Sequence, residues 1–238
     1  MNKIINWDNI RDFAYVNSDV CTQPVRGIVL WFLGLGVTDR EDGESQNGIL
    51  CGKRGILTVL PYYNPWSWMN DQAAAYVNEI LDVIYDHYSL PDDLPLISTG
   101  VSMGGLASIA YMVKAKRTPT ACIANCPVCD LPTHYSEQAD IPCSLYSAFG
   151  QYDIPFDEAI RTVSPLHLVN RLPDVPYTVF HGDADSCVFK NHSDRFVAAM
   201  RQAGRDITYI EIPGGEHDYL SGKEKEYFDA EVFRLCGV

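Results

Sequence analysis

The chain contains a serine whose neighbours suit it to nucleophilic catalysis. Ser102 lies in the pentapeptide Gly100-Val101-Ser102-Met103-Gly104, which matches the pattern G-x-S-x-G. In a sharp turn from a strand into a helix, glycine on both sides of the serine removes side chains that would clash with the backbone. The hydroxyl then stands exposed at the end of the strand. A serine held in this way can attack an ester or amide carbonyl and form an acyl-enzyme.

A serine needs a general base to become a nucleophile, and the base needs a carboxylate to orient it. For this type of turn, the acid and then the histidine follow the serine along the chain. After the apolar segment 176–180 the histidines are His181, His192 and His217. His217 directly follows the last apolar segment, 207–212, and loops at the carboxyl edge of a parallel sheet are where catalytic groups collect. We therefore predict that His217 is the base.

The acid is expected in the loop that follows the 176–180 segment. That loop begins His181-Gly182-Asp183-Ala184-Asp185 and supplies two carboxylates. Both Asp183 and Asp185 lie between the serine and His217 in the chain, as the order of the three groups requires. Residue type and order therefore leave the choice between them open.

The elements that must position these groups alternate between strands and helices. Continuous apolar runs are typical of strands buried in a parallel sheet, and they cover 27–33, 55–61, 95–97, 121–124, 176–180 and 207–212. A short alternating segment, 11–18, predicts an edge strand. Helices are expected over 46–53, from 72 onward, after the serine as far as 114–117, and over 193–203 and 223–235. The alternation predicts an α/β fold with a mostly parallel sheet and helices on both faces.

One segment interrupts this alternation. Residues 130–175 are rich in proline and show little periodicity, and we interpret them as an insertion of short helices. We expect this insertion to form a small cap over the site. A chain of 238 residues fits one domain, so we predict that residues 1–238 form a single domain.

Three motifs in this order resemble the α/β-hydrolase superfamily. They are the G-x-S-x-G pentapeptide, the run His-Gly-Asp-x-Asp-x-x-Val with Ser164-Pro165 upstream of it, and Gly-Gly-x-His. Over roughly residues 25–235 the chain is most similar to the catalytic domain of the prolyl oligopeptidase and dienelactone hydrolase-like branch. In that branch the second acidic residue of the loop belongs to the catalytic triad. The resemblance therefore implies a triad of Ser102, Asp185 and His217, with Asp183 ordering the loop.

The resemblance also implies an oxyanion hole of two backbone N–H groups. One belongs to Met103, the residue after the nucleophile. The other comes from the loop after the 27–33 strand, where members of the family often carry His-Gly-x-Gly and this chain has Leu33-Gly34-Leu35-Gly36. Leu33 replaces the histidine, but a backbone donor does not need that side chain. We predict Leu35 as the second donor, with Gly34 as the alternative.

Two other patterns have a functional and a structural interpretation. Tyr62, Tyr63, Trp66 and Trp68 form an aromatic loop that either lines the substrate pocket or packs as an anchor, because aromatic side chains do both. The C-x-x-C segment Cys126-Pro127-Val128-Cys129 lacks a second ligand pair and a thioredoxin-like context, so we predict no metal site. A glycine-rich phosphate loop is also lacking, and we expect no cofactor.

Composition bears on partners and on location. The net charge of −13 argues against nucleic acid and against an anionic membrane as partners. The first residues lack the apolar core of a signal peptide, and no segment is long enough to span a membrane. Eight cysteines are scattered along the chain. Without a signal peptide we expect them to be free thiols, and the protein to be cytoplasmic.

These inferences predict a serine hydrolase that cleaves a small-molecule carboxylic ester through an acyl-enzyme. One alternative is a serine peptidase that acts on short peptides. The relevant peptidases generally carry an additional N-terminal propeller domain, whereas only about 25 residues precede the first expected core strand here. A second alternative is a catalytically silent binding protein on the same fold. Such proteins usually lack a member of the triad, and this chain has all three.

Overall fold

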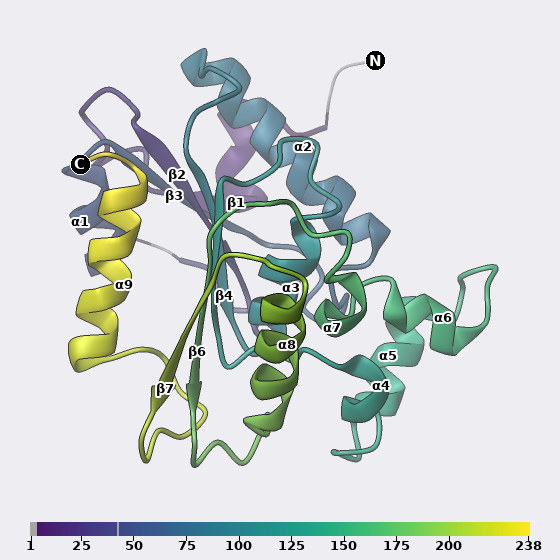
Figure 1. Ribbon diagram of the computed structural model, residues 1–238. Helices are drawn as coiled ribbons and strands as arrows, with labels where there is room; N and C mark the ends of the chain where they lie inside the picture. The colour runs from purple at the N-terminus through teal and green to yellow at the C-terminus, as the bar shows by residue number, and fades with distance from the viewer. Residues whose placement is uncertain (1–3, 42) are drawn as a thin grey trace.

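In the computed structural model, which describes residues 4–41 and 43–238, seven strands form one sheet in the order β1-β3-β2-β4-β5-β6-β7 (Figure 1). They are β1 (Ala14–Val16), β2 (Gly27–Phe32), β3 (Ile56–Pro61), β4 (Leu96–Val101), β5 (Ala121–Asn125), β6 (Tyr177–Gly182) and β7 (Ile207–Ile212). Only the β1–β3 pair is antiparallel. The mostly parallel α/β sheet expected from the sequence is confirmed.

Helices cover both faces of this sheet. The helices that flank the sheet are α1 (Gln46–Gly52), α2 (Asp71–Tyr88), α3 (Met103–Tyr111), α8 (Asn191–Gln202) and α9 (Gly222–Leu235). Figure 1 shows α1 and α9 on one face and α2, α3 and α8 on the other. The core is divided in the same way, because Val29, Ile97 and Ile123 pack with residues of α9, whereas α2 and α3 contribute to the larger cluster on the opposite face.

Helix α2 shows how the sequence sets these elements. Asn70 caps it, since the Asn70 carboxamide accepts a hydrogen bond from the backbone N–H of Ala73 at 3.0 Å. Its buried side chains repeat at helical spacing and include Val77, Ile80 and Ile84. This apolar face packs on the sheet and supports the strands that carry the site.

Two elements are shorter than the sequence pattern predicts. The edge strand expected over 11–18 is present as β1, which spans only Ala14–Val16. The residues before it form a short 3-10 helix, η1 (Trp7–Asp12), because a capping box formed by Asn6 and Asn9 starts a helical turn there. The helix after Ser102 was expected to reach 114–117, but α3 ends at Tyr111.

A side chain of α2 accounts for the early end of α3. The Asn78 carboxamide donates to the Lys114 carbonyl at 3.2 Å and accepts from the Lys116 N–H at 2.9 Å. It also accepts from the Tyr111 hydroxyl at 2.8 Å. Asn78 thus pairs with backbone groups that a further turn of α3 would otherwise have to satisfy.

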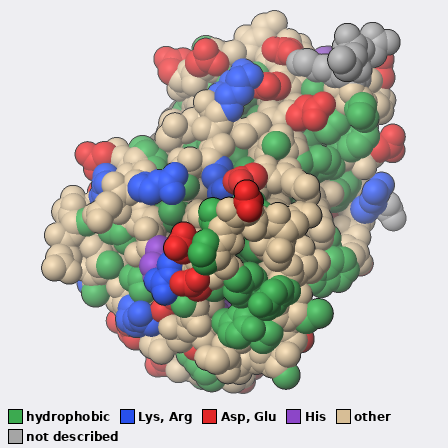
Figure 2. Space-filling view, turned by 90° about the vertical axis from the view of Figure 1, so that its right-hand side faces the viewer, with side chains coloured by type: hydrophobic (Ala, Val, Ile, Leu, Met, Phe, Trp, Pro, Cys, Tyr) green, Lys and Arg blue, Asp and Glu red, His purple; other side chains and the backbone are tan. Residues whose placement is uncertain are grey.

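The segment 130–175 contains four short helices among the described residues. They are α4 (Leu131–His134), α5 (Ile141–Phe149), α6 (Phe156–Arg161) and α7 (Pro165–Leu168). The indole of Trp68 donates to Ser144 Oγ at 2.5 Å and the Asn70 carboxamide donates to the Ala148 carbonyl at 3.2 Å, so α5 is fastened beside the start of α2. Figure 2 faces this side, where acidic and basic side chains are interspersed with hydrophobic patches.

Two further expectations concern the whole chain. All eight cysteines are free thiols, as the sequence predicted. Of the helices that the structure describes, none combines the length and the apolar character needed to cross a lipid bilayer.

Candidate active site

Ser102 occupies a strained turn between β4 and α3. Its backbone angles are φ 62° and ψ −125°, in a region that residues with a side chain rarely adopt. A Cβ atom added at Gly100 would lie 2.4 Å from the Gly104 carbonyl oxygen, and one added at Gly104 would lie 2.1 Å from the Phe32 carbonyl oxygen. Both glycines are therefore required by backbone contacts, which is the mechanical reason for the motif.

The acid and the base meet across the ends of β6 and β7. Nδ1 of His217 lies 2.7 Å from Oδ2 of Asp185. The other oxygen of Asp185 accepts hydrogen bonds from the backbone N–H groups of Cys187 and Val188, each at 2.9 Å. Because the carboxylate can only accept, Nδ1 carries the proton and Nε2 of His217 is left to act as a base.

Asp183 has a different partner. Its carboxylate accepts a hydrogen bond from the backbone N–H of Gly214 at 2.6 Å, in the loop that leads to His217. The two loops also touch through their backbones, since the N–H of Ala184 donates to the Gly215 carbonyl at 2.9 Å. The geometry thus joins Asp185 to His217 and uses Asp183 to hold the two loops together.

The environment of Asp185 keeps it ionised. Its side chain is fully buried, and burial alone would raise the pKa of the carboxyl. Hydrogen bonds from His181, His217 and the Val188 N–H outweigh burial and hold the pKa of Asp185 well below its usual range. Asp185 is therefore ionised and accepts the Nδ1 proton of His217, which fixes the orientation of the imidazole.

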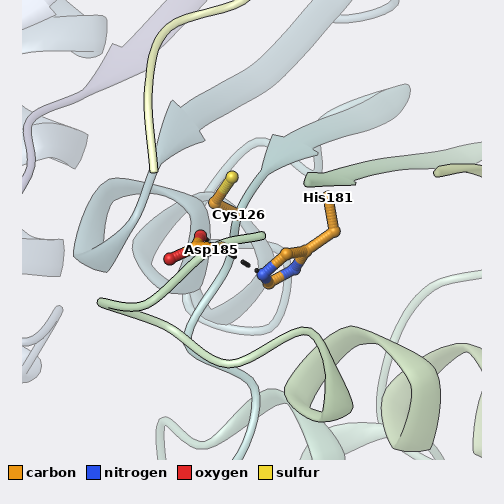
Figure 3. Close-up of side chains that lie close together, drawn as sticks. All are labelled: Cys126, His181 and Asp185. Atoms are coloured by element: carbon orange, nitrogen blue, oxygen red, sulfur yellow. Dashed lines mark ion pairs between the residues drawn. The ribbon is translucent and has the colours of Figure 1, made fainter. Parts of the chain in front are cut away.

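His181 supports this carboxylate from behind (Figure 3). Its Nε2 lies 2.8 Å from the Val188 carbonyl and 3.4 Å from Oδ2 of Asp185. Its Nδ1 lies 2.7 Å from Ser193 Oγ on α8. The imidazole is fully buried, so it ties the loop of Asp185 to a helix. His181 is therefore a positioning residue for Asp185.

We expect His181→Gln to lower kcat by about 10²-fold, because a displacement of Asp185 by about 1 Å misaligns His217. Since the effect passes through Asp185, adding His181→Gln to an Asp185→Asn variant should lower kcat much less than it does alone. His192→Gln is the matched control, a buried histidine of α8 bonded away from the site. Equal losses from His181→Gln in both backgrounds would contradict a role through Asp185.

Ser102 and His217 line the same cavity, of about 470 Å³. Its other lining residues come from strands β1 to β4, from the start of α1 and from the loops after β2 and β7: Tyr15, Trp31, Phe32, Leu33, Gly34, Leu35, Val37, Glu41, Ser45, Asn47, Thr58, Leu60, Val101, Asp218 and Tyr219. Across the described part of the chain, no hydrogen bond joins Ser102 Oγ to His217. In sites of this kind that contact commonly tightens only when substrate is bound.

The loop 33–36 is held against this cavity by the aromatic loop. The hydroxyl of Tyr63 donates to the Leu33 carbonyl at 2.8 Å, and the Gly36 N–H donates to the Pro65 carbonyl at 3.0 Å. Leu35 and Gly34 both line the cavity with Ser102, and Met103 is the first residue of α3. Backbone N–H groups at a helix start are unpaired by the helix itself and suit a developing negative charge.

The four aromatic residues of that loop do not line the cavity that the described residues enclose. Tyr63 and Trp68 are buried, and Trp66 is 46% exposed. The hydroxyl of Tyr62 accepts a hydrogen bond from the Glu41 N–H at 3.0 Å. These contacts correspond to the anchoring interpretation, and the loop acts on the site by supporting its neighbours.

The cavity wall contains residues that sequence reasoning missed. Trp31, Glu41, Asp218 and Tyr219 line it, whereas none of the described residues of 130–175 does. Asp218 and Tyr219 directly follow His217, and Trp31 is near the end of the strand that precedes the loop 33–36. Their closeness in the sequence to predicted site residues was the signal that could have identified them.

Two clusters bring together side chains of the types that bind metals. In each cluster, hydrogen bonds assign a proton to a histidine nitrogen. In the cluster of Cys126, His181 and Asp185, Nε2 of His181 must carry a proton to donate to the Val188 carbonyl, and burial raises the pKa of Cys126 to about 12. The second cluster is His134, Glu137 and His192. There, Nδ1 of His192 accepts from the Asp130 N–H, so Nε2 is protonated and donates to Glu137. A metal could bind at either cluster only if such protons were released.

The sheet order, the strained serine between β4 and α3, and the paired Asp185 and His217 at one sheet edge define an α/β hydrolase. The model of the prolyl oligopeptidase family matches residues 77–235, more than half of the chain. The protein belongs to this family and is a serine hydrolase. A search of curated protein sequences finds no significant match.

Solved structures of peptidases and esterases share the fold. The puromycin-hydrolyzing peptidase of Mycobacterium tuberculosis superposes with a TM-score of 0.73 at 17% identity, over 93% of this chain and 37% of that one. A thermophilic esterase of Thermogutta terrifontis gives 0.68 at 19% identity, over 93% and 87%. An S-formylglutathione hydrolase of Agrobacterium tumefaciens gives 0.68 at 18%, over 94% and 88%. The present chain thus spans about 37% of the length of the first structure.

Proposed function

We propose that the protein is an esterase that hydrolyses an uncharged carboxylic ester through an acyl-enzyme on Ser102. The observation that carries the proposal is the convergence of Ser102, in its strained turn, and the Asp185–His217 pair, at 2.7 Å, on one cavity.

The reaction follows from the positions of the protons. Nε2 of His217 accepts the hydroxyl proton as Ser102 Oγ attacks the ester carbonyl, and Asp185 stabilises the imidazolium that results. The backbone N–H groups of Met103 and Leu35 donate to the oxyanion, each contributing about 3 kcal/mol in the transition state. The alcohol leaves with the proton from His217. Water, deprotonated by the same histidine, then hydrolyses the acyl-enzyme and restores the serine.

The charge of the cavity wall supports an uncharged substrate. Glu41 and Asp218 line it, and among the lining residues that the structure describes there is no lysine or arginine. The chain as a whole carries a net charge of −13. A substrate with a carboxylate, such as a short peptide with a free C-terminus, would be repelled by this wall. A neutral ester avoids that cost.

A peptidase acting on short peptides is the second candidate. The fold is shared with a peptidase described as puromycin-hydrolyzing, and the Glu41 carboxylate in the cavity wall offers a partner for a substrate ammonium group. Under this alternative, the scissile bond is an amide and the same three residues carry out the chemistry.

A paired substrate screen separates the candidates. We expect p-nitrophenyl esters from acetate to decanoate to be hydrolysed, and aminoacyl p-nitroanilides to be inert. A fluorophosphonate probe is expected to label Ser102 at neutral pH, and the Ser102→Ala variant serves as the unlabelled control. Turnover of the anilides would establish the peptidase, whereas absence of both labelling and turnover would establish a catalytically silent binding protein.

A further inference from the structure

A second hollow of about 150 Å³ adjoins the catalytic cavity. It is lined by Trp31, Asn47, Thr99, Gly100, Val101, Ile123, Asn125, Tyr219, Leu220, Lys225 and Phe228. Four of these residues, Trp31, Asn47, Val101 and Tyr219, also line the catalytic cavity. The two spaces therefore share a wall, and Val101 in that wall is bonded directly to Ser102. We call the second hollow the side chamber.

Strand register places the side chamber on the α9 face of the sheet. Trp31 is paired with Thr99, and Thr99 is paired with Ile123. Cross-strand partners in a parallel sheet point to the same face, and Ile123 packs with Phe228 of α9. Ile123 and Phe228 are 2% and 5% exposed, whereas Tyr219 is 68% exposed. The chamber thus has an exposed rim and a buried end.

The interior of the side chamber is apolar in effect. Asn47 and Tyr219 are exposed residues of the rim. Deeper in the chamber the polar side chains have partners within the protein: the Thr99 hydroxyl donates to the Ile123 carbonyl at 2.6 Å, and the Asn125 carboxamide donates to the Asp218 carbonyl at 2.8 Å. The Lys225 ammonium is bound by the Asp229 carboxylate at 2.5 Å. A ligand with polar atoms would lose hydrogen bonds to water there without replacement. An alkyl chain fits this environment.

We infer that the side chamber binds the acyl chain of the ester and limits its length. The inference rests on the proposed esterase function, because an acyl group on Ser102 Oγ begins beside Val101, at the wall shared by the two spaces. An apolar protein cavity of about 150 Å³ holds benzene, a ligand of about six carbon atoms, and the side chamber has a similar volume of about 150 Å³. The substrate class is therefore a short-chain ester with an acyl group of about four to six carbons.

The test is the dependence of kcat/KM on acyl length for p-nitrophenyl esters from acetate to decanoate. We expect kcat/KM to rise by about fourfold per buried methylene, to peak between butanoate and hexanoate, and to fall for longer chains. The ratio of the hexanoate value to the acetate value is measured on one enzyme sample, so partial loss of folded protein does not affect it.

Two substitutions at the buried end should move the peak in opposite directions. Ile123→Phe fills the chamber and is expected to lower the hexanoate-to-acetate ratio by at least tenfold. Phe228→Leu enlarges it and should move the peak to longer chains. Val232→Ala is the matched control, because Val232 is buried in α9 with Phe228 and does not line the chamber. If Ile123→Phe does not fold, Phe228→Leu tests the proposal by itself.

The outcomes distinguish the two proposals. If wild type hydrolyses short esters but neither substitution changes the ratio, the acyl-chamber assignment is wrong and the esterase stands. If no ester of any length is hydrolysed and the fluorophosphonate probe fails to label Ser102, the esterase proposal falls and the chamber assignment with it. A shift of the peak by Val232→Ala equal to that by Phe228→Leu would also overturn the assignment.

Discussion

Replacing Ser102 by alanine is expected to lower kcat by about 10⁵–10⁶-fold, because the acyl-enzyme can no longer form and the remaining rate comes from the oxyanion donors alone. Alanine has a Cβ atom like serine, so the strained φ of 62° is retained and the fold should be unchanged. Ester hydrolysis by the purified variant, together with its thermal unfolding curve, checks both statements.

Ser108→Ala is the matched control for this substitution. Ser108 is fully buried on α3, the helix that begins directly after Ser102, and its hydroxyl donates to the Gly105 carbonyl at 2.8 Å. Its loss should cost about 1 kcal/mol of stability and leave kcat within a few fold. Wild-type activity in Ser102→Ala would refute the assignment of the nucleophile. If iodoacetamide then abolished that activity, the exposed thiol of Cys187 would be the residue to replace next.

Replacing Asp185 by asparagine should lower kcat by about 10⁴-fold, because an amide can hold the wrong tautomer of His217. Asp183→Asn is the same chemical change two residues earlier. It replaces the charged acceptor of the Gly214 N–H with a neutral amide oxygen, so it should weaken this hydrogen bond, act mainly on stability and lower kcat far less. Steady-state kinetics of both variants decide the matter. A larger loss from Asp183→Asn would identify Asp183 as the acid of the triad.

The Asp185→Asn variant also tests how the stability of the protein depends on pH. Hydrogen bonds hold the pKa of Asp185 below its usual range, so the folded state favours the ionised carboxylate. This contribution to stability is fully present above the unfolded pKa of about 3.9 and is lost as the pH falls through the folded-state pKa. The free energy of unfolding of wild type minus that of Asp185→Asn should therefore decrease below about pH 4. Urea unfolding at neutral pH and at about pH 3 measures this difference.

The strands and the strained turn at Ser102 could be predicted from the sequence because their signals are local. The run 207–212 is a strand with those bounds, and the two glycines around Ser102 meet backbone atoms that any such turn would bring close. The bond between Asp185 and His217 was less accessible. Choosing Asp185 over Asp183 depends on how two loops pack against each other, and only family resemblance could supply that choice before the structure.

The wall of the site could not be predicted for a related reason. A cavity is bounded by whichever side chains several loops turn toward it, and apolar side chains look alike in sequence whether they face a ligand or the core. Tyr63 and Trp68 are residue types that commonly line pockets, yet they are buried. Glu41 is a residue type that is typical of solvated loops, yet it lines the cavity. Side-chain direction, which depends on tertiary packing, separates these cases.

The position of β7 affects how catalytic activity is lost on heating. Within the described chain β7 is the last strand of the sheet, its only strand partner is β6, and none of its residues is fully buried. The loop that carries His217 begins where β7 ends, whereas Ser102 belongs to the centre of the sheet. Edge elements with few buried contacts open at a lower free energy than the core. Fraying of this one strand would withdraw the base while β4 and α3 remain folded. Catalytic activity should therefore disappear on heating before the cooperative melting of the domain, and return on cooling.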